Sequence, residues 1–164
     1  MKKKISVITA ALLCCAMLAG CGSSNSSSGS ASVSDSESVT AKTPAEKTAE
    51  LLGAVEFPSM VEVSADDLSA RYGFGSDKVS SFSAYVCGSG AMPDEFGVFE
   101  AADETSAAEI KTALESRIEN QKELYTDYTP AEMYKFDGYL LRQDGTTVAY
   151  AICADNTAAE DILG

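Results

Sequence analysis

The sequence predicts an α+β domain in which an antiparallel sheet of about four strands is packed on one face by a long helix, with short flanking helices. Three observations predict this fold. Apolar residues recur at helical spacing over 106–125, two alternating runs lie between residues 79 and 101, and two more surround Asp144-Gly145. The expected order is helix, helix, strand, strand, long helix, strand, strand, helix.

Short helices are expected near both ends of the domain. Thr43-Pro44-Ala45-Glu46 combines an N-cap hydroxyl, a proline at the first helical position and a glutamate at the third. Ser64-Ala65-Asp66-Asp67 predicts a second helix, which Gly73 would end, and the last helix follows Asn156-Thr157. Residues 60–63 indicate a brief extended piece between the first two helices.

The predicted strands form two pairs. Residues 79–87 and 96–101 alternate between two faces, and residues 88–93 join them as a loop. Residues 139–141 and 148–153 flank Asp144-Gly145, the strongest hairpin pattern in the chain. Both pairs therefore predict antiparallel neighbours.

The long helix lies between these two pairs of strands. Ser106 and Glu109 predict a capping box at its start, and Thr129-Pro130-Ala131-Glu132 repeats the pattern of the first helix cap beyond its end. Its buried face is expected to contain residues spaced three or four apart: Ile110, Leu114, Ile118, Gln121 and Tyr125.

The first 21 residues have the pattern of a bacterial lipoprotein signal. Lys2, Lys3 and Lys4 precede an apolar run over 5–17, which is too short for a permanent membrane span. Leu18-Ala19-Gly20-Cys21 then places a cysteine behind small residues. We expect residues 1–20 to be removed and Cys21 to be lipidated, because two acyl chains hold a protein on a membrane where one does not.

Three regions follow from this pattern: the signal peptide 1–20, a lipidated serine-rich tether 21–42 and a single α+β domain 43–164. The expected location is extracytoplasmic, at the outer face of the cell membrane. The formal charge is −13 and becomes −16 without the three lysines of the signal, which excludes nucleic acid as a partner. The expected partners are the membrane, through Cys21, and an envelope protein or small ligand.

Cys87 and Cys153 are the cysteines that remain after processing and lipidation. They have two possible states. An exported protein could join them in one disulfide, or both could be reduced and buried on neighbouring strands, which the apolar alternation around each of them favours.

The residue types limit the chemistry. The chain has no histidine, which excludes serine–histidine and cysteine–histidine catalysis and histidine-ligated metals, and two distant thiols do not make a zinc site. We therefore expect no metal, no cofactor and no catalytic residues. Paired carboxylates are the remaining enzymatic route, but Asp94 and Glu95 are adjacent on a strand and should point to opposite faces, one of them to solvent.

A polar cluster is expected beside the long helix. Glu95 could pair with Arg117, and Gln121 and Tyr128 lie one turn and about three turns further along the helix. The alternative for these four residues is an exposed surface ion pair that contributes about 0–1 kcal/mol.

Several of these segments resemble one family, the domain-of-unknown-function family 4358 of small bacterial lipoproteins. The likeness extends from about residue 45 to residue 164. It is carried by Tyr72-Gly73-Phe74, Asp94-Glu95-Phe96-Gly97-Val98-Phe99, Arg117 with Gln121, Tyr128-Thr129-Pro130-Ala131-Glu132, Gly138 and Asp144-Gly145. The resemblance implies an exported, lipid-anchored domain without an assigned activity.

Three functions are compatible with these observations. The first is a non-enzymatic, lipid-anchored binding or accessory module of the cell envelope. The second is a carboxylate-dependent hydrolase of envelope polymers, which requires a cleft with two acids about 5–10 Å apart. The third is a structural spacer, which predicts neither a pocket nor an exposed aromatic patch.

Overall fold

The structure, a computed structural model, describes residues 41–164. The expected signal peptide 1–20, the lipidated Cys21 and nearly all of the tether 21–42 lie outside the described residues. The described part begins just before the first helix, α1 (Pro44–Ala54).

A five-stranded antiparallel sheet forms the centre of the fold, in the order β1-β2-β3-β5-β4. The strands are β1 (Met60–Glu62), β2 (Val79–Cys87), β3 (Glu95–Ala101), β4 (Leu140–Asp144) and β5 (Thr147–Ile152). The hairpin of β4 and β5 places β5 beside β3, so β3 lies in the middle of the sheet.

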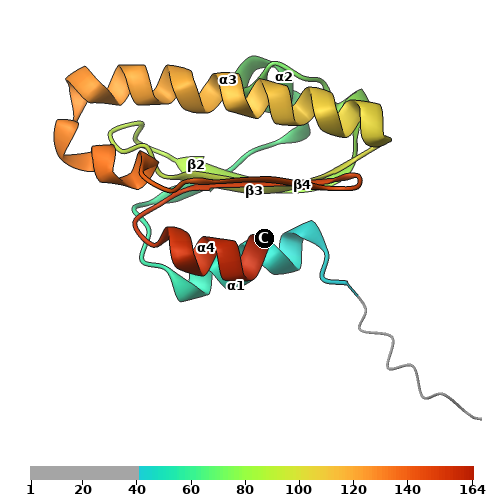
Figure 1. Cartoon of the computed structure of the whole chain (residues 1–164), viewed down its shortest axis with the longest axis horizontal. Helices are drawn as coiled ribbons and strands as arrows, with labels where there is room; N and C mark the ends of the chain where they lie inside the picture. Colours follow the sequence, from blue (N-terminus) through green and yellow to red (C-terminus); the bar gives the residue numbers. More distant parts are fainter. Residues whose placement is uncertain (1–40) are drawn as a thin grey trace, which may run out of the picture. The chain divides into compact units, whose positions relative to one another are not determined.

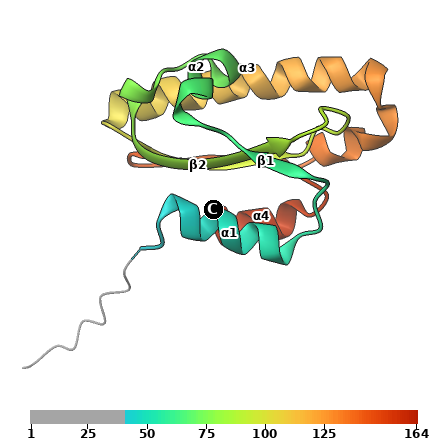
Figure 2. The ribbon, with the colours of Figure 1, turned by 180° about the vertical axis from the view of Figure 1, so that it is seen from behind.

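Helices cover both faces of this sheet (Figure 1). The long helix α3 (Glu104–Tyr128) and the short α2 (Leu68–Tyr72) lie on one side, whereas α1 and α4 (Asn156–Leu163) lie on the other, as the reverse view in Figure 2 also shows. The remaining helical turns are short 3₁₀ helices: η1 (Ala65–Asp67), η2 (Ser76–Lys78) and η3 (Pro130–Phe136). No helix within residues 41–164 combines the length and apolarity needed to cross a membrane.

The predicted α+β class is confirmed, as are the antiparallel sheet and the long helix on one of its faces. The brief extended piece at residues 60–63 becomes β1, which pairs with β2 and gives the sheet its fifth strand. The short helices α1 and α4 bury the second face of the sheet.

Helix caps are the least accurate part of the prediction. α1 has the expected capping box between Thr43 and Glu46, and Gly73 ends α2 with a positive φ of 83°. The prediction for α3 is wrong: its N-cap is Asp103, whose side chain accepts from the Ser106 amide. A carboxylate three residues before the expected hydroxyl satisfies free amides at the start of the helix.

The second Thr-Pro-Ala-Glu segment also differs from the first. It forms η3, and the Thr129 hydroxyl makes no cap hydrogen bond and has no partner among the described residues. The same four letters therefore give an α-helix start in one context and a 3₁₀ helix in the other, because the chain around Thr129 is already held by the end of α3 through the Thr129 amide and the Tyr125 carbonyl.

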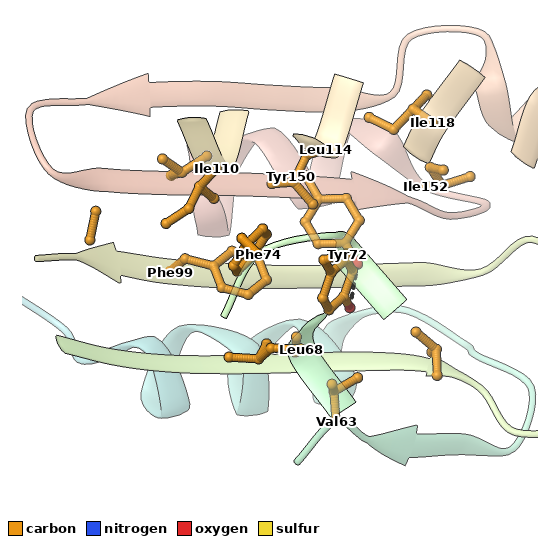
Figure 3. Close-up of a cluster of buried hydrophobic side chains, with 14 of the residues drawn as sticks. Val63, Leu68, Tyr72, Phe74, Phe99, Ile110, Leu114, Ile118, Tyr150 and Ile152 are labelled. Atoms are coloured by element: carbon orange, nitrogen blue, oxygen red, sulfur yellow. Dashed lines mark hydrogen bonds between the residues drawn. The ribbon is translucent and has the colours of Figure 1, made fainter. Parts of the chain in front are cut away.

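The two faces of the sheet carry separate cores. On the α3 side, Ile110, Leu114 and Ile118 pack on Phe99, Tyr150 and a set of smaller apolar residues (Figure 3). On the other side, a second cluster joins the two short helices to the sheet: Leu51, Val55, Phe96, Val98, Leu140, Ala149, Ala151, Cys153, Ala159 and Leu163. The alternation expected for the central strands therefore matches the two cores.

Gly97 permits close packing at the centre of β3. It lies between Ala84 of β2 and Tyr150 of β5 in the sheet register. A β-carbon at position 97 would come within 2.8 Å of the Ala84 Cβ and 3.1 Å of the Tyr150 Cε1. The absence of a side chain thus leaves room for the Tyr150 ring, whose hydroxyl meets that of Tyr72 at 2.8 Å.

We predict that Gly97→Ala destabilises the fold by about 1–3 kcal/mol, because the added methyl group must displace Ala84 or Tyr150. Gly53→Ala is the matched control. Gly53 lies in α1 with no atom within 4 Å of a β-carbon, so alanine there should stabilise the helix by about 0.5–1 kcal/mol. Urea unfolding of the two variants measures both effects, and an unchanged midpoint for Gly97→Ala would contradict the packing argument.

Candidate functional site

A groove with a volume of about 470 Å³ lies between α2 and α3. Two arginines and several polar side chains of α3 line it. The lining residues are Arg71, Tyr72, Gly73, Ala113, Ser116, Arg117, Asn120, Gln121 and Leu124. A second, shallower cavity lined by Asp67, Ala70, Arg71 and Arg117 adjoins it at the two arginines.

Arg117 is held beneath this groove by an ion pair with Glu95. The Arg117 Nε donates to both carboxylate oxygens of Glu95 at 2.9 and 3.1 Å, and its Nη2 donates to Oε2. The Glu95 side chain is 2% exposed and that of Arg117 is 17% exposed. A two-pronged contact of this kind fixes the plane of the guanidinium as well as its position.

Two further contacts complete the arrangement around Arg117. Its Nη1 donates to the backbone carbonyl of Arg71 at 2.8 Å, which ties the end of α2 to α3. The Gln121 side-chain amide donates to Glu95 Oε2 at 3.4 Å. The carboxylate of Glu95 therefore accepts from two successive turns of α3.

Two buried tyrosines lie beside the ion pair. The Arg117 guanidinium lies 5.1 Å from the centre of the Tyr72 ring, and Tyr72 shares its hydroxyl hydrogen bond with Tyr150 (Figure 3). Burial, together with the charge of Glu95, raises the pKa of both hydroxyls. Burial opposes the charge on Arg117, but Glu95 outweighs it and raises the Arg117 pKa, so the guanidinium stays charged.

The structure places three of the four residues expected in the polar cluster together: Glu95, Arg117 and Gln121. Tyr128 lies elsewhere. It is 63% exposed at the end of α3, where its ring meets the Tyr125 ring edge-on at 6.2 Å.

The groove and the Glu95–Arg117 pair lie in a part of the chain that matches a protein family. The sequence model of the family described as Domain of unknown function (DUF4358) matches residues 53–153. The chain belongs to this family. The matched region contains every residue that lines the groove and the whole sheet, whereas most of α1 and all of α4 lie beyond it. No curated protein and no solved structure matches the chain.

Arg71 and Asn120 are two of the groove residues that the sequence did not single out. Arg71 lies in the last turn of α2, and its guanidinium makes no hydrogen bond or ion pair with residues 41–164. Only its basic charge at a helix end, two residues before Gly73, could have suggested a role. Asn120 lies three residues after Arg117 and therefore on the same side of α3.

The prediction that either Asp94 or Glu95 points to solvent is wrong. Neither Asp94 nor Glu95 lies at the solvent, because Asp94 is 1% exposed and its Oδ2 accepts from Lys135 at 2.6 Å. Lys135 also contacts Glu132 at 2.7 Å. The Asp94 Oδ1 has no partner among the described residues. The expected alternation holds, since Glu95 pairs with α3 and Asp94 with η3.

Asp94 and Glu95, the acidic pair expected from the sequence, do not form the acid pair of a two-acid hydrolase. Such an enzyme needs two carboxyl groups that face one substrate. Asp94 and Glu95 pair with cations from different elements, and Asp94 and Glu132 share the ammonium group of Lys135. Within residues 41–164, no three histidine, cysteine, aspartate or glutamate side chains gather where they could hold a metal.

Cys87 and Cys153 are both free and buried. They end β2 and follow β5, the two strands that flank β3, and two strand spacings separate them by about 10 Å. A disulfide requires its two Cα atoms within about 7 Å of each other. The reduced state favoured by the apolar pattern therefore agrees with the strand order, although the two strands are not neighbours.

We predict that disrupting the Glu95–Arg117 pair gives strongly non-additive losses of stability. Arg117→Ala leaves a buried carboxylate without its cation and should cost about 3–5 kcal/mol. The double variant Glu95→Ala/Arg117→Ala should lose about 1–3 kcal/mol less than the sum of the single variants. Chemical denaturation of the four proteins measures this coupling.

The exposed pair between Arg142 and Glu160, at 3.7 Å, is the control for this cycle. Arg142→Ala should change the free energy of unfolding by no more than about 1 kcal/mol, because water replaces the partner. Additive losses at Glu95 and Arg117 would contradict the contact that the structure shows.

We predict that an alkylating reagent modifies Cys87 before Cys153. Burial raises the Cys153 pKa to about 11. Burial also acts against the Cys87 thiolate, but hydrogen bonds from Ser89 and from backbone amides of the β2–β3 loop outweigh it and lower the Cys87 pKa. Peptide mass mapping after a short reaction at pH 8 measures the order, with Cys87→Ser as the control. Faster labelling of Cys153 would contradict the assignment.

Proposed function

We propose that this chain is a lipid-anchored, non-enzymatic binding module of the cell envelope, and that the α2–α3 groove is its recognition site. The groove is the observation that supports this proposal. Its volume of about 470 Å³ is in the size range of small-molecule and short-peptide sites, and its polar groups belong to two helices that Arg117 connects.

The signal pattern supports the anchor. Three lysines, the apolar run 5–17 and Leu18-Ala19-Gly20-Cys21 have the order of a lipoprotein leader. Acylation of Cys21 would place the domain at the outer face of the membrane, with the serine-rich residues 21–42 between the two.

The geometry of the α2–α3 groove favours binding over catalysis at this site. Glu95, the carboxylate nearest the groove residues, is engaged by Arg117 and Gln121 and is not among the residues that line the groove. A structural spacer is less well supported than a binding module, because it gives no reason for a groove with an unpaired arginine at its edge.

We predict that Cys21→Ala releases the protein from the membrane. The wild-type chain should be recovered in the membrane fraction with a mass that contains the acyl chains and lacks residues 1–20, and the variant should lack the acyl mass. Ser23→Ala, two residues away, is the control. Recovery of unacylated wild-type chain from the cytosol, with its leader intact, would contradict the anchor.

The non-enzymatic role has its own test. Hydrolysis of an envelope polysaccharide or peptide by the purified chain, with loss of activity in Glu95→Gln, would replace the binding module with the carboxylate-dependent hydrolase.

A further inference from the structure

We propose that the α2–α3 groove binds a single carboxylate carried on an amide-containing molecule, such as the C-terminal end of a short peptide. This inference rests on the proposed function and names the ligand class of the same groove. It follows from three properties of the residues that line the groove: an unpaired cation, unpaired amide groups and an adjoining apolar surface.

Arg71 is the unpaired cation. Its side chain lines the groove and the adjoining cavity, and it has no acidic partner among residues 41–164. Asp67 lines only the adjoining cavity, where it accepts from the Ser64 hydroxyl at 2.7 Å. The planar fork of a guanidinium matches the two oxygens of a carboxylate, so Arg71 can bind such a group through two parallel hydrogen bonds.

Arg117 offers further donors to the same group. Its Nε and one N–H of Nη2 are used by Glu95, and one N–H of Nη1 is used by the Arg71 carbonyl. One N–H on each Nη group is left over. The ion pair with Glu95 holds these donors in a fixed plane, which lowers the entropy that a ligand must overcome.

Two amides of α3 extend the site beyond the arginines. Gln121 donates its amide N–H to Glu95, which leaves its carbonyl oxygen as an acceptor, and Asn120 has no partner among the described residues for either end of its amide. Peptide groups offer both an N–H and a carbonyl to such side chains. Leu124, 57% exposed at the next turn, supplies the apolar contact.

The charge pattern selects a small ligand. The chain as a whole has a formal charge of −13, which repels extended polyanions. A single carboxylate at the groove is within reach of Arg71, whereas more distant acidic residues are screened beyond a Debye length of about 8–10 Å. A phosphate would satisfy the arginines and could accept from the Asn120 amide nitrogen, but it brings no peptide N–H for the carbonyl oxygens of Asn120 and Gln121.

The test uses the chain from residue 21 onward with Cys21→Ser, so that it stays unacylated. Three probes are titrated: N-acetyl-alanyl-alanine with a free carboxylate, the same dipeptide with a C-terminal amide, and inorganic phosphate. Side-chain amide NMR signals of Asn120 and Gln121 report binding at the groove. We expect the carboxylate probe to bind with a Kd of about 1 mM or below. The amide probe and phosphate should each bind at least about tenfold more weakly.

Arg71→Gln should weaken binding of the carboxylate probe by about tenfold or more, whereas Arg142→Gln, the same change on β4, should leave it unaltered. The Arg71 variant keeps its fold, since this side chain has no partner in residues 41–164. Four results would each overturn the proposal: equal binding of the amide probe, preference for phosphate, normal binding by Arg71→Gln, or no shift with any probe at about 10 mM. None of these results would bear on the proposed lipid anchor, because the mass of the acylated chain tests the anchor separately.

Discussion

Burial of the Glu95 carboxylate is the constraint on which the arrangement of α3 depends. An ionised group out of contact with water costs several kcal/mol unless a cation and hydrogen bonds compensate for it. Arg117 and Gln121, one turn apart on α3, supply that compensation. Sliding α3 by one turn, about 5.4 Å, would remove the cation from Glu95, so the pair fixes the helix position more strictly than apolar contacts do. Because apolar residues can often replace a buried pair without loss of stability, this positional role does not depend on a large net stabilisation.

The same pair also determines the position of α2. This helix has five residues, too few to be stable by itself, and its end is held where the Arg71 carbonyl accepts from Arg117. Tyr72 then packs under the guanidinium and contacts Tyr150, whose ring occupies the space that Gly97 leaves open. Arg117 and Tyr72, two of the residues that line the groove, are thus already immobilised before a ligand binds.

Local patterns in the sequence predict most of the fold but only part of the site. Helical spacing in 106–125 and the Asp144-Gly145 turn are local signals, so α3 and the last hairpin were predictable. The apolar run 148–153 predicts a strand, but it does not indicate that α1 and α4 cover the second face of the sheet. The pairing of Glu95 with Arg117 was predictable, because each is a charged residue on the face of its strand or helix that points toward the other element. Tyr128 was misplaced since α3 carries it past the sheet to an exposed end, and the burial of Asp94 depends on Lys135, which arrives through η3.

The net charge of this chain and the positions of its charged side chains in the fold lead to different expectations about what it attracts. The formal charge of −13 describes the field at a distance and predicts repulsion of polyanions. The fold then neutralises Glu95 and Asp94 internally with Arg117 and Lys135, which removes those cations from the exposed surface. Arg71 keeps its charge unpaired beside the groove, because no acidic side chain of residues 41–164 forms an ion pair with it. An acidic domain can therefore present a locally cationic site. The buried ion pairs explain why the charge beside the groove differs in sign from the net charge of the chain.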